Sequence, residues 1–487
     1  MNRTLRRMIG ASVLIVLLTC AALSTAAIET VGTVADLLAK GGFVKSADLH
    51  PVGADSPTTF LILGSDQRDK GAVDYATGHS DTILLVHLDP GSGLWSEMSI
   101  PRDFYVHWSW QGVTHDTKIN EAFTIGGVKA SLHVVTDLLH IPINYLVDIS
   151  FTAFDKIVDK LGCVYVDVDH RYYNPPGTGF ATIDVRPGYQ RLCGQHALDY
   201  VRYRHFDNTF ARDAREQAFL RDAKEQLGLS GLLGHAQDII NALSGYITSN
   251  IRGSSTVAGL VETLVGSVSG PVNQVQFPDN PIVIGGGDYQ TATPAEIRSV
   301  VRRFLEPKVA APQVAGIVAA ARRAVRRRHH AHGSSAGSFT PAAPHLIATS
   351  PSVATQAQTL APNVNFPVVV PSLSLDSATL DNLEPFSHYA VSDPQGHVHL
   401  GYRIDFATGG TGSYYGIEGL NWTDPPLFAH ADRLRVAGVN YLYVNTGGKV
   451  QDVGWIAHGA LYWISNTIFQ DLTNDQMFAL AESASGG

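Results

Sequence analysis

The sequence predicts an α/β domain with three layers, α-β-α, followed by a smaller α+β domain at the C-terminus. Three observations lead to this expectation. Apolar runs typical of buried strands alternate with segments of helical spacing between residues 58 and 307. A stretch rich in arginine, serine, alanine and proline then interrupts the pattern. Tyrosine-rich alternating segments follow it, and the 487 residues are enough for two or three domains with their own cores.

The N-terminus has the features of a membrane anchor. Residues 1–7 carry three arginines, and residues 8–28 contain no charge over a length that spans a bilayer as a helix. The basic flank predicts a short cytoplasmic tail, a single-pass signal anchor in the cell membrane and an extracytoplasmic C-terminus. A cleaved signal peptide is the alternative, because residues 22–27 are small, although the apolar stretch is longer than such peptides need. Cys20 follows threonine, which fits a lipidation signal poorly, so we assign it to the span.

The remaining cysteines, Cys163 and Cys193, lie beyond this segment. Outside the cytoplasm a pair of thiols can oxidise, and we prefer a disulfide to two free buried thiols. A disulfide that closes the loop of 29 residues between them would stabilise the fold by about 3–4 kcal/mol if the bond is unstrained.

The elements of the first domain follow from local patterns. TTFLILGSD, DTILLVHLDP and LWSEMSIPRD are apolar runs that predict strands, and Gly91-Ser92-Gly93 predicts a hairpin between the last two. Helical spacing covers residues 126–140 and FTAFDKIVDKLG, which ends at a glycine. CVYVDVDH alternates as a strand does, and TIDVRPGYQRL predicts a further short strand and turn. Residues 208–227 predict one helix and residues 231–267 two more with apolar faces.

A linker and a second domain complete the chain. Residues 308–362 begin with a basic run of arginine and histidine and continue with serine, alanine and proline, which predicts a disordered linker. Outside the membrane this run is better explained as a solvated tether than as a nucleic-acid site. Residues 363–487 alternate as strands in HVHLGYRIDF and YLYVNTGGKVQDVGWIAHGALYWIS and end in a capped helix. No group of catalytic residues is visible in this module, so we expect it to be a binding or structural module and not a second active site.

Arginines gather in the first domain although the chain has a net charge of -9. ALDYVRYRHF predicts a strand in which Arg202 and Arg204 share one face. Arg212 and Arg215 are three apart on the following helix and share a face as well, and Arg102 follows a strand. Because guanidinium groups match phosphate oxygens in a planar, bidentate way, this set predicts a pyrophosphate ligand.

Two carboxylates favour a metal beside such a ligand. Asp66 and Asp81 each stand at the edge of a predicted strand. Two carboxylates with open water positions suit Mg²⁺ that bridges phosphate oxygens. The alternative for each residue alone is a turn cap or an ion pair with one arginine.

Several motifs in order resemble one family. LILGSDQR, HSDTILLVHLDP, SIPRDFYV, KINEAF, the glycine pair 126–127, LVDISFTAFDKIVDKLG, PGYQRLCGQHALDYVRYRH and ARDAREQ resemble the LytR-CpsA-Psr family of cell-envelope proteins. The resemblance implies transfer of a glycopolymer from a polyprenyl-pyrophosphate carrier to peptidoglycan in cell-wall biogenesis. It also implies apolar helices that line a tunnel for the isoprenoid tail. The end of the chain weakly resembles lipoprotein-carrier-like sensor domains.

The resemblance assigns roles to named residues. Arg102, Arg202 and Arg204 would hold the pyrophosphate, and Asp66 and Asp81 would bind Mg²⁺. Lys118, Arg212, Arg215 and His79 would belong to the same charged substrate-binding mouth. Phosphoryl transfer with polyprenyl phosphate as the leaving group follows from these roles. No general base is evident, and Asp66 or Asp103 is the nearest candidate.

The chain departs from the family pattern at three positions. His79 replaces an arginine, Thr209 replaces an aspartate, and Glu216 stands where the family has glutamine. Glu216 lies four residues after Arg212 and is expected to pair with it. These changes keep open a non-catalytic receptor for polyprenyl-pyrophosphate or wall polymer. A lipid pyrophosphatase, in which water is the acceptor at the same site, is a further alternative. DNA binding is disfavoured by the acidic chain and the external location.

Overall fold

The computed structural model describes residues 42–53, 56–65, 78–177, 181–203, 211–226, 247–268, 272–306, 345–410, 412–436, 438–446 and 448–485. The chain forms two compact units, and neither is a continuous stretch of sequence. The first contains residues 1–95, 105–161 and 229–270. The second contains residues 96–104, 162–228 and 271–487, so it combines part of the predicted α/β domain with the C-terminal module. The predicted border near residue 307 lies inside the second unit.

The first unit is built on a mixed sheet with helices, which confirms the predicted α/β class. Its elements are β1 (Gly42–Phe43), β2 (Thr58–Ser65), β3 (Ser80–Asp89), β5 (Tyr105–Trp110), β6 (Val113–Lys118), α2 (Glu121–Leu139), β7 (Tyr145–Ser150), α3 (Phe151–Lys160), β12 (Ile247–Ser249) and α6 (Ser254–Val268). The strands run in the order β1-β12-β7-β2-β3, and β2 pairs antiparallel with β3 and parallel with β7. β5 and β6 form a separate hairpin.

Apolar side chains explain why this sheet carries helices. β2 buries Leu61 and Leu63 completely, as expected for a central strand. Leu264 of α6 packs against Leu84, Val86 and Leu88 of β3, so α6 covers one face of the sheet. β12 interrupts the segment 231–267 that was predicted as two helices, and of these two helices the structure describes α6.

The glycine pair in α2 has a specific structural reason. The helix begins at Glu121 and is kinked at Gly126 and Gly127. Gly127 has a φ of 64°, which favours glycine, and a Cβ atom on Gly126 would lie 2.6 Å from Nε1 of Trp110. The two glycines thus allow α2 to bend against the β5–β6 hairpin.

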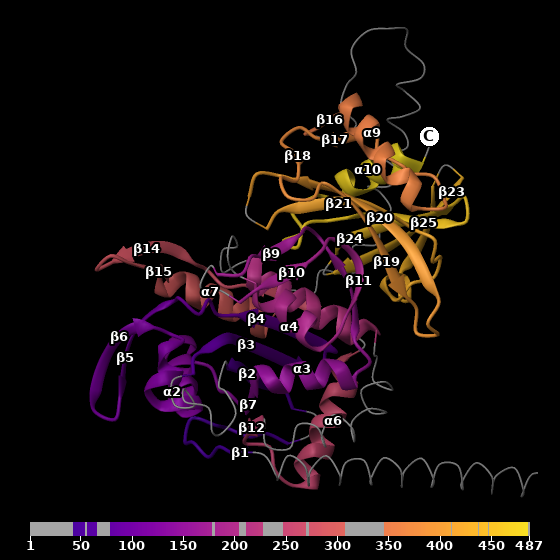
Figure 1. Cartoon of the computed structure of the whole chain (residues 1–487). Helices are drawn as coiled ribbons and strands as arrows, with labels where there is room; N and C mark the ends of the chain where they lie inside the picture. Colours follow the sequence, from indigo (N-terminus) through magenta and orange to yellow (C-terminus); the bar gives the residue numbers. More distant parts are fainter. Residues whose placement is uncertain are drawn as a thin grey trace, which may run out of the picture. The chain divides into compact units, whose positions relative to one another are not determined.

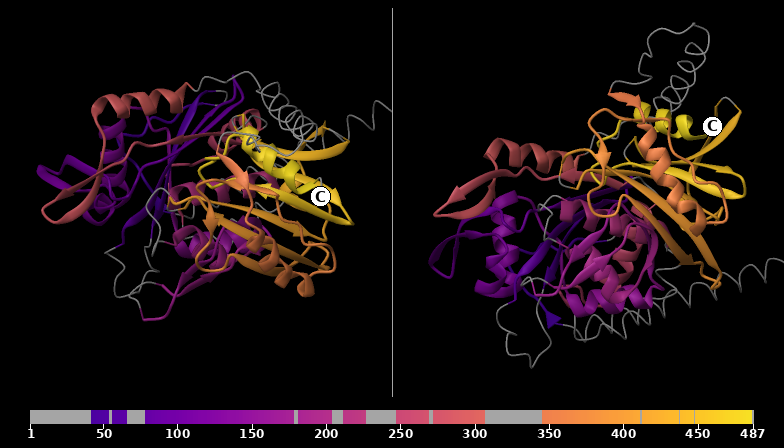
Figure 2. Two further views of the ribbon diagram at one scale, coloured as in Figure 1. Left: turned by 90° about the horizontal axis from the view of Figure 1, so that it is seen from above. Right: turned by 45° about the horizontal axis from the view of Figure 1, so that its top comes forward.

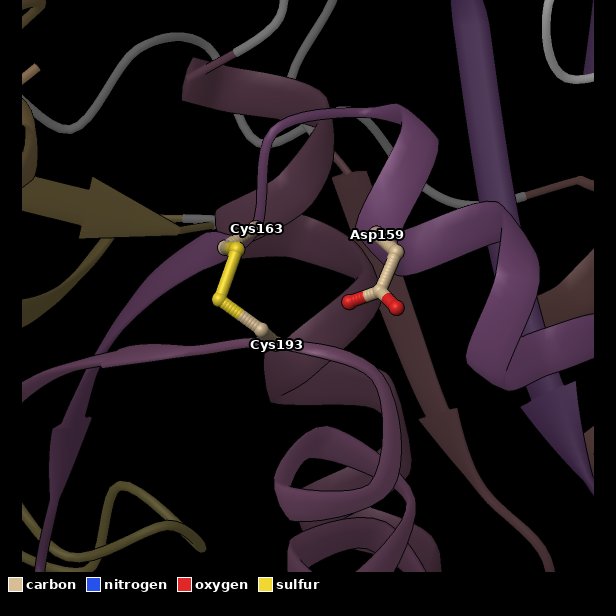
Figure 3. A group of neighbouring side chains, drawn as sticks. All are labelled: Asp159, Cys163 and Cys193. Atoms are coloured by element: carbon tan, nitrogen blue, oxygen red, sulfur yellow. A yellow bond between two sulfur atoms is a disulfide. The ribbon is translucent and has the colours of Figure 1, made fainter.

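The second unit begins within β4 (Leu94–Ser99) and includes both short hairpins and helices. Its elements before the C-terminal module are β8 (Val164–Val168), β9 (Tyr172–Asn174), β10 (Ile183–Val185), β11 (Gly188–Leu192), α4 (Gly194–Arg202), a helix at residues 211–226, β13 (Val272–Gln276), β14 (Asn280–Ile284), β15 (Gly287–Thr291) and α7 (Pro294–Leu305). β4 pairs with β13, β8 with β11, β9 with β10, and β14 with β15. A disulfide joins Cys163 and Cys193 at the start of β8 and before α4 (Figure 3).

The C-terminal module is an antiparallel sheet with helices on one face, as the alternating pattern predicted. Its elements are β16 (Leu346–Ala348), α9 (Pro351–Ala357), η1 (Gln358–Asn363), β17 (Leu373–Leu375), β18 (Thr379–Leu380), β19 (Phe386–Ser392), β20 (Val398–Ala407), β21 (Tyr414–Leu420), η2 (Pro426–Phe428), β22 (Asp432–Val436), β23 (Val439–Thr446), β24 (Lys449–Ala457), β25 (Ala460–Ser465) and α10 (Asn474–Ser485). The sheet order is β18-β20-β21-β25-β24-β23-β22, with β19 also on β20. α9 and α10 lie over this sheet (Figures 1 and 2).

The module starts earlier than the composition predicted. Residues 345–362 were assigned to the linker, but they form β16, α9 and η1. Leu346, Val353 and Leu360 lie in the same apolar core as the module sheet. These few apolar residues order the segment although serine, alanine and proline surround them. Residues 307–344, with the basic run, lie outside the described residues.

Both faces of the module sheet are buried, and this places the module in the second unit. Successive residues of a strand point to opposite faces. Tyr462 and Ile464 of β25 join the core under α9 and α10, whereas Trp463 joins a second core with Tyr165 of β8 and Tyr189 of β11. The second face of the module sheet is therefore covered by β8 and β11.

A buried cluster of charges reinforces this packing. Arg403 of β20 is fully buried and pairs with Asp405 and Glu418 of its own sheet. Its Nη1 atom also lies 2.5 Å from Oδ1 of Asp167 in β8. Asp167 accepts a further hydrogen bond from Nε1 of Trp463 at 3.0 Å. One cation thus joins three carboxyl groups from both parts of the second unit.

Candidate functional site

Among the described residues of the first unit are three of the predicted site residues. Asp81 is the second residue of β3, His79 comes directly before this strand, and Lys118 is the last residue of β6. All three side chains are partly exposed. The hydroxyl of Thr124 in α2 donates a hydrogen bond to the carbonyl of Gly78 at 3.0 Å, which fixes the backbone before His79. Asp66 lies outside the described residues.

The structure adds one carboxyl group to this region that the sequence did not point to. Asp148 lies on β7 opposite Leu63, and its side chain is buried. Burial raises the pKa of Asp148 to about 7, while a hydrogen bond with Ser65 lowers it. A single aspartate in an apolar strand, YLVDIS, is the signal that marks this position.

Arg202 is at the end of a helix, and the strand predicted for ALDYVRYRHF is wrong. α4 ends at Arg202, and the chain leaves the helical conformation at Tyr203. Ala197, Leu198 and Val201 are buried on one face of this helix. The helical spacing of these residues is hard to recognise in the sequence, because the residues at the end of the helix alternate as they do in a strand. Arg204 lies outside the described residues, so the shared face predicted for the two arginines is not tested.

A local carboxylate orients Arg202. Its Nη2 atom lies 2.5 Å and its Nε atom 3.1 Å from Oδ1 of Asp199, one helical turn earlier. Asp199 also accepts a hydrogen bond from Gln195 at 2.7 Å. The Arg202 side chain remains 28% exposed, so it can contact a ligand.

Arg215 was predicted to belong to the substrate-binding mouth, but the structure places its side chain inside the protein. Its side chain is fully buried, and it donates hydrogen bonds of 2.6 Å to the carbonyls of Tyr200 and Tyr203. The guanidinium also lies 4.4 Å from the ring centre of Tyr172. Arg215 therefore stabilises the C-terminal end of α4, where a cation is favourable.

Arg212 and Arg102 each have an acidic neighbour. Nη2 of Arg212 lies 3.0 Å from Asp213, and its Nε lies 3.6 Å from Glu216, which is the pairing expected from their spacing. Nε of Arg102 lies 3.5 Å from Asp103, and the Arg102 side chain is 15% exposed. The sites of Arg102, Arg202 and Arg212 are all within the second unit.

Two further carboxyl groups lie near these arginines. Burial raises the pKa of Asp213, although Arg212 lowers it, and the charge of Asp103 raises it further. Burial and the charge of Asp213 raise the pKa of Asp279 to about 7, so this group can take up or release a proton near neutral pH. Asp213 directly follows Arg212 in ARDAREQ, and this pair of adjacent opposite charges is the sequence feature that could have pointed to Asp213.

A small acidic cavity lies deeper in the second unit. Its volume is about 40 Å³, and Asp167, Asp222 and Asp452 are among the residues that line it. Burial raises the pKa of Asp222 to about 8, with Arg221 lowering it and Glu225 and Asp167 raising it. Burial likewise raises the pKa of Asp452. Asp222 therefore holds its proton at a pH where exposed aspartates have lost theirs, and the pKa of Asp452 is shifted in the same direction.

Asp222 is expected to make the protein less stable as the pH rises. The unfolded chain loses this proton near pH 4, whereas the folded protein keeps it up to about pH 8. Unfolding therefore releases a proton between these values, so the free energy of unfolding falls with increasing pH. Asp222→Asn should flatten this slope and stabilise the protein at pH 8 by more than ~1 kcal/mol. Urea unfolding from pH 5 to 8 measures how the free energy of unfolding depends on pH. Asp424→Asn, at an exposed aspartate, is the control. Equal slopes in wild type and both variants would contradict the prediction.

Comparison with known proteins identifies the family. The model of the LytR_cpsA_psr family matches residues 29–304, which is more than half of the chain. The chain therefore belongs to this family, as its motifs indicated.

Individual relatives match parts of the chain. The polyisoprenyl-teichoic acid–peptidoglycan teichoic acid transferase TagU of Bacillus anthracis is 30% identical over 203 residues, covering 41% of this chain and 62% of TagU. The chain thus spans about three-fifths of that relative. Biofilm regulatory protein A of Streptococcus mutans is 25% identical over 316 residues, covering 61% of this chain and 76% of the relative.

Solved structures match at lower identity. Protein gbs0355 from Streptococcus agalactiae has a TM-score of 0.47 and 24% identity, covering 52% of this chain and 89% of that protein. TagV of B. subtilis has a TM-score of 0.43 and 23% identity, covering 52% and 98% respectively.

Proposed function

We propose that this protein is a membrane-anchored phosphotransferase that moves a glycopolymer from a polyprenyl-pyrophosphate carrier to peptidoglycan during cell-wall assembly. The observation that carries the proposal is membership of the LytR_cpsA_psr family together with the arginines that this family implies. The name of the TagU relative describes such a transfer with teichoic acid as the polymer. Arg102 and Arg202 present partly exposed guanidinium groups that suit this chemistry.

The arginines supply electrostatic stabilisation. A hydroxyl oxygen of the acceptor forms a bond to the phosphorus that carries the glycan, and the bond from this phosphorus to the bridging oxygen breaks. Polyprenyl phosphate leaves, and a base takes the hydroxyl proton. Arg102, Arg202 and Arg204 neutralise the negative charge on the phosphate oxygens, and fixed donors do so without rearranging in the transition state.

Mg²⁺ is part of this proposal. The donors that would hold it are the carboxylates of Asp81 and Asp66, and oxygen atoms of this type are the ligands that Mg²⁺ prefers. Asp81 is partly exposed at the start of β3, which leaves room for water ligands. When bound, the ion would neutralise charge on the pyrophosphate.

The membrane location also belongs to the proposal. The predicted anchor, residues 8–28, lies outside the described residues. Among the residues that the structure describes, no helix has the length and apolar character to cross a bilayer. The proposal therefore depends on the sequence of the N-terminus and on the extracytoplasmic substrates that the family implies.

A transfer assay tests the function. The full chain in detergent is given Mg²⁺ and a short-chain polyprenyl-pyrophosphate disaccharide, with and without soluble peptidoglycan fragments. We expect glycan phosphate on the acceptor, loss of this product in Arg204→Ala, and dependence on Mg²⁺ that chelation removes. Exposed Arg186→Ala is the matched control. Release of glycan phosphate into water alone, even with the acceptor present, would indicate a pyrophosphatase. Binding without turnover would indicate a receptor.

A further inference from the structure

The second unit contains a cavity of about 380 Å³ that both of its parts line. One wall comes from the end of β4, the helix at residues 211–226, β13 and α7. The other wall comes from the C-terminal module, with Thr446, Lys449 and residues 468–470. We call this space, lined by these elements, the Gln274 cavity. Its volume is within the range of small-ligand sites and holds about one or two sugar rings.

The two walls are in close contact beside the cavity. A Cβ atom on Gly412 of the module would lie 2.6 Å from Cβ of Ala211 and 3.2 Å from the ring of Phe469. Gly412 also has a φ of 80°, which favours glycine. The module loop therefore packs on the first residue of the described helix, directly before Arg212.

The Gln274 cavity adjoins Arg102, a proposed phosphate-binding arginine, and Arg212, which was assigned to the substrate-binding mouth. Pro101 and Asp213 line it. Pro101 directly precedes Arg102, and Asp213 directly follows Arg212 and accepts a hydrogen bond from it at 3.0 Å. The Arg212 side chain is only 3% exposed, so a molecule in this cavity would lie next to a pyrophosphate held by Arg102.

The lining is polar and suits a sugar better than an isoprenoid chain. Gln217, Gln274 and Gln470 bring amide groups to the cavity, and amides both donate and accept hydrogen bonds. The Nε2 atom of Gln274 is buried, and no residue in the described part of the chain accepts a hydrogen bond from it. Together these amides give the cavity a polar wall that the hydroxyl groups of a sugar can match.

Apolar and cationic side chains complete the lining. Phe469 lines the cavity and provides a flat surface for the apolar face of a sugar ring. Arg303 and Lys449 are exposed at the lining, and the ammonium group of Lys449 donates to the carbonyl of Gln470 at 3.0 Å. Two cations beside amides and an aromatic ring match a glycan that carries a carboxylate.

We propose that the Gln274 cavity binds a sugar residue of the acceptor glycan and that the C-terminal module supplies part of this site. The proposal rests on the proposed function, because it assigns a place to the second substrate of that reaction. The amide groups of the lining meet hydroxyl groups of the sugar, Phe469 contacts the ring, and Lys449 attracts a carboxylate of the glycan. The module is then a substrate-recognition element of the transferase.

Acceptor kinetics test the assignment. In the full chain in detergent, Gln274→Leu and Lys449→Ala are each expected to raise KM for soluble muramidase-released peptidoglycan fragments at least tenfold. KM for the polyprenyl-pyrophosphate disaccharide should stay within twofold, since the donor contacts other residues. Arg435→Ala, an exposed arginine of β22 that does not line the cavity, is the control. A rise in donor KM at saturating acceptor, with acceptor KM unchanged, would mean that the cavity holds the donor sugar and would overturn the assignment.

Direct binding separates this proposal from the proposed function. Isothermal titration of the same fragments into wild type should show binding that Lys449→Ala and Gln274→Leu weaken at least tenfold, with unchanged thermal melting. Binding without any transfer would refute the enzymatic function and leave the glycan site standing. Equal binding by wild type and both variants, or none by wild type, would refute the glycan site.

Discussion

Arg202→Ala is expected to lower the rate of glycan transfer by about 10²–10³-fold, a loss typical of removing one donor that stabilises developing charge. Arg202 ends α4, and its guanidinium is held by Asp199 at 2.5 Å while 28% of the side chain stays exposed. The pair with Asp199 restricts the motion of the guanidinium group, so part of its ordering is complete before phosphate binds. Steady-state transfer to peptidoglycan fragments in the presence of Mg²⁺ measures the effect.

Arg202→Lys distinguishes charge from geometry. Lysine keeps the positive charge but lacks the planar fork, so we expect it to recover only part of the lost rate. Arg186→Ala, which removes an exposed arginine of the same unit, should leave transfer unchanged. A rate for Arg202→Ala within twofold of wild type, with normal melting, would remove Arg202 from the catalytic set.

Arg403→Leu is expected to destabilise the protein by about 3–5 kcal/mol, because it leaves buried carboxyl groups without their cation. Asp405 and Glu418 pair with Arg403 from its own sheet, and Asp167 pairs with it from β8. Burial would lower the pKa of Arg403, but the three carboxyl groups raise it. Burial raises the pKa of Asp405 and of Glu418, so removal of the guanidinium would increase proton uptake there.

Chemical unfolding and thermal melting measure the change in Arg403→Leu. Arg433→Leu removes an exposed arginine of β22 and should alter stability by less than about 0.5 kcal/mol. The loss should be larger at pH 8 than at pH 5, because the remaining carboxyl groups are more readily protonated at the lower pH. Equal stability of Arg403→Leu and wild type at pH 8 would show that the cluster does not support the fold.

Local patterns in the sequence predicted most strands and helices. TTFLILGSD, DTILLVHLDP and the alternating segments after residue 397 became β2, β3, β20 and β23–β25, since a run of apolar residues or a period of two is enough to indicate a strand. The same local information pointed to Arg102, Asp81 and the pairing of Arg212 with Glu216. These features depend on residues that are close together in the chain.

Tertiary structure decided the rest. Whether ALDYVRYRHF forms a strand or a helix depends on which side chains become buried, and Arg215 supports α4 through carbonyls more than ten residues away. Arg403 and Asp167 are 236 residues apart, and the Gln274 cavity combines β13 with a module loop nearly two hundred residues later. Composition and periodicity describe what a segment can bury and how it repeats. They do not specify which distant segment it meets, because that choice is made by the packing of the complete core.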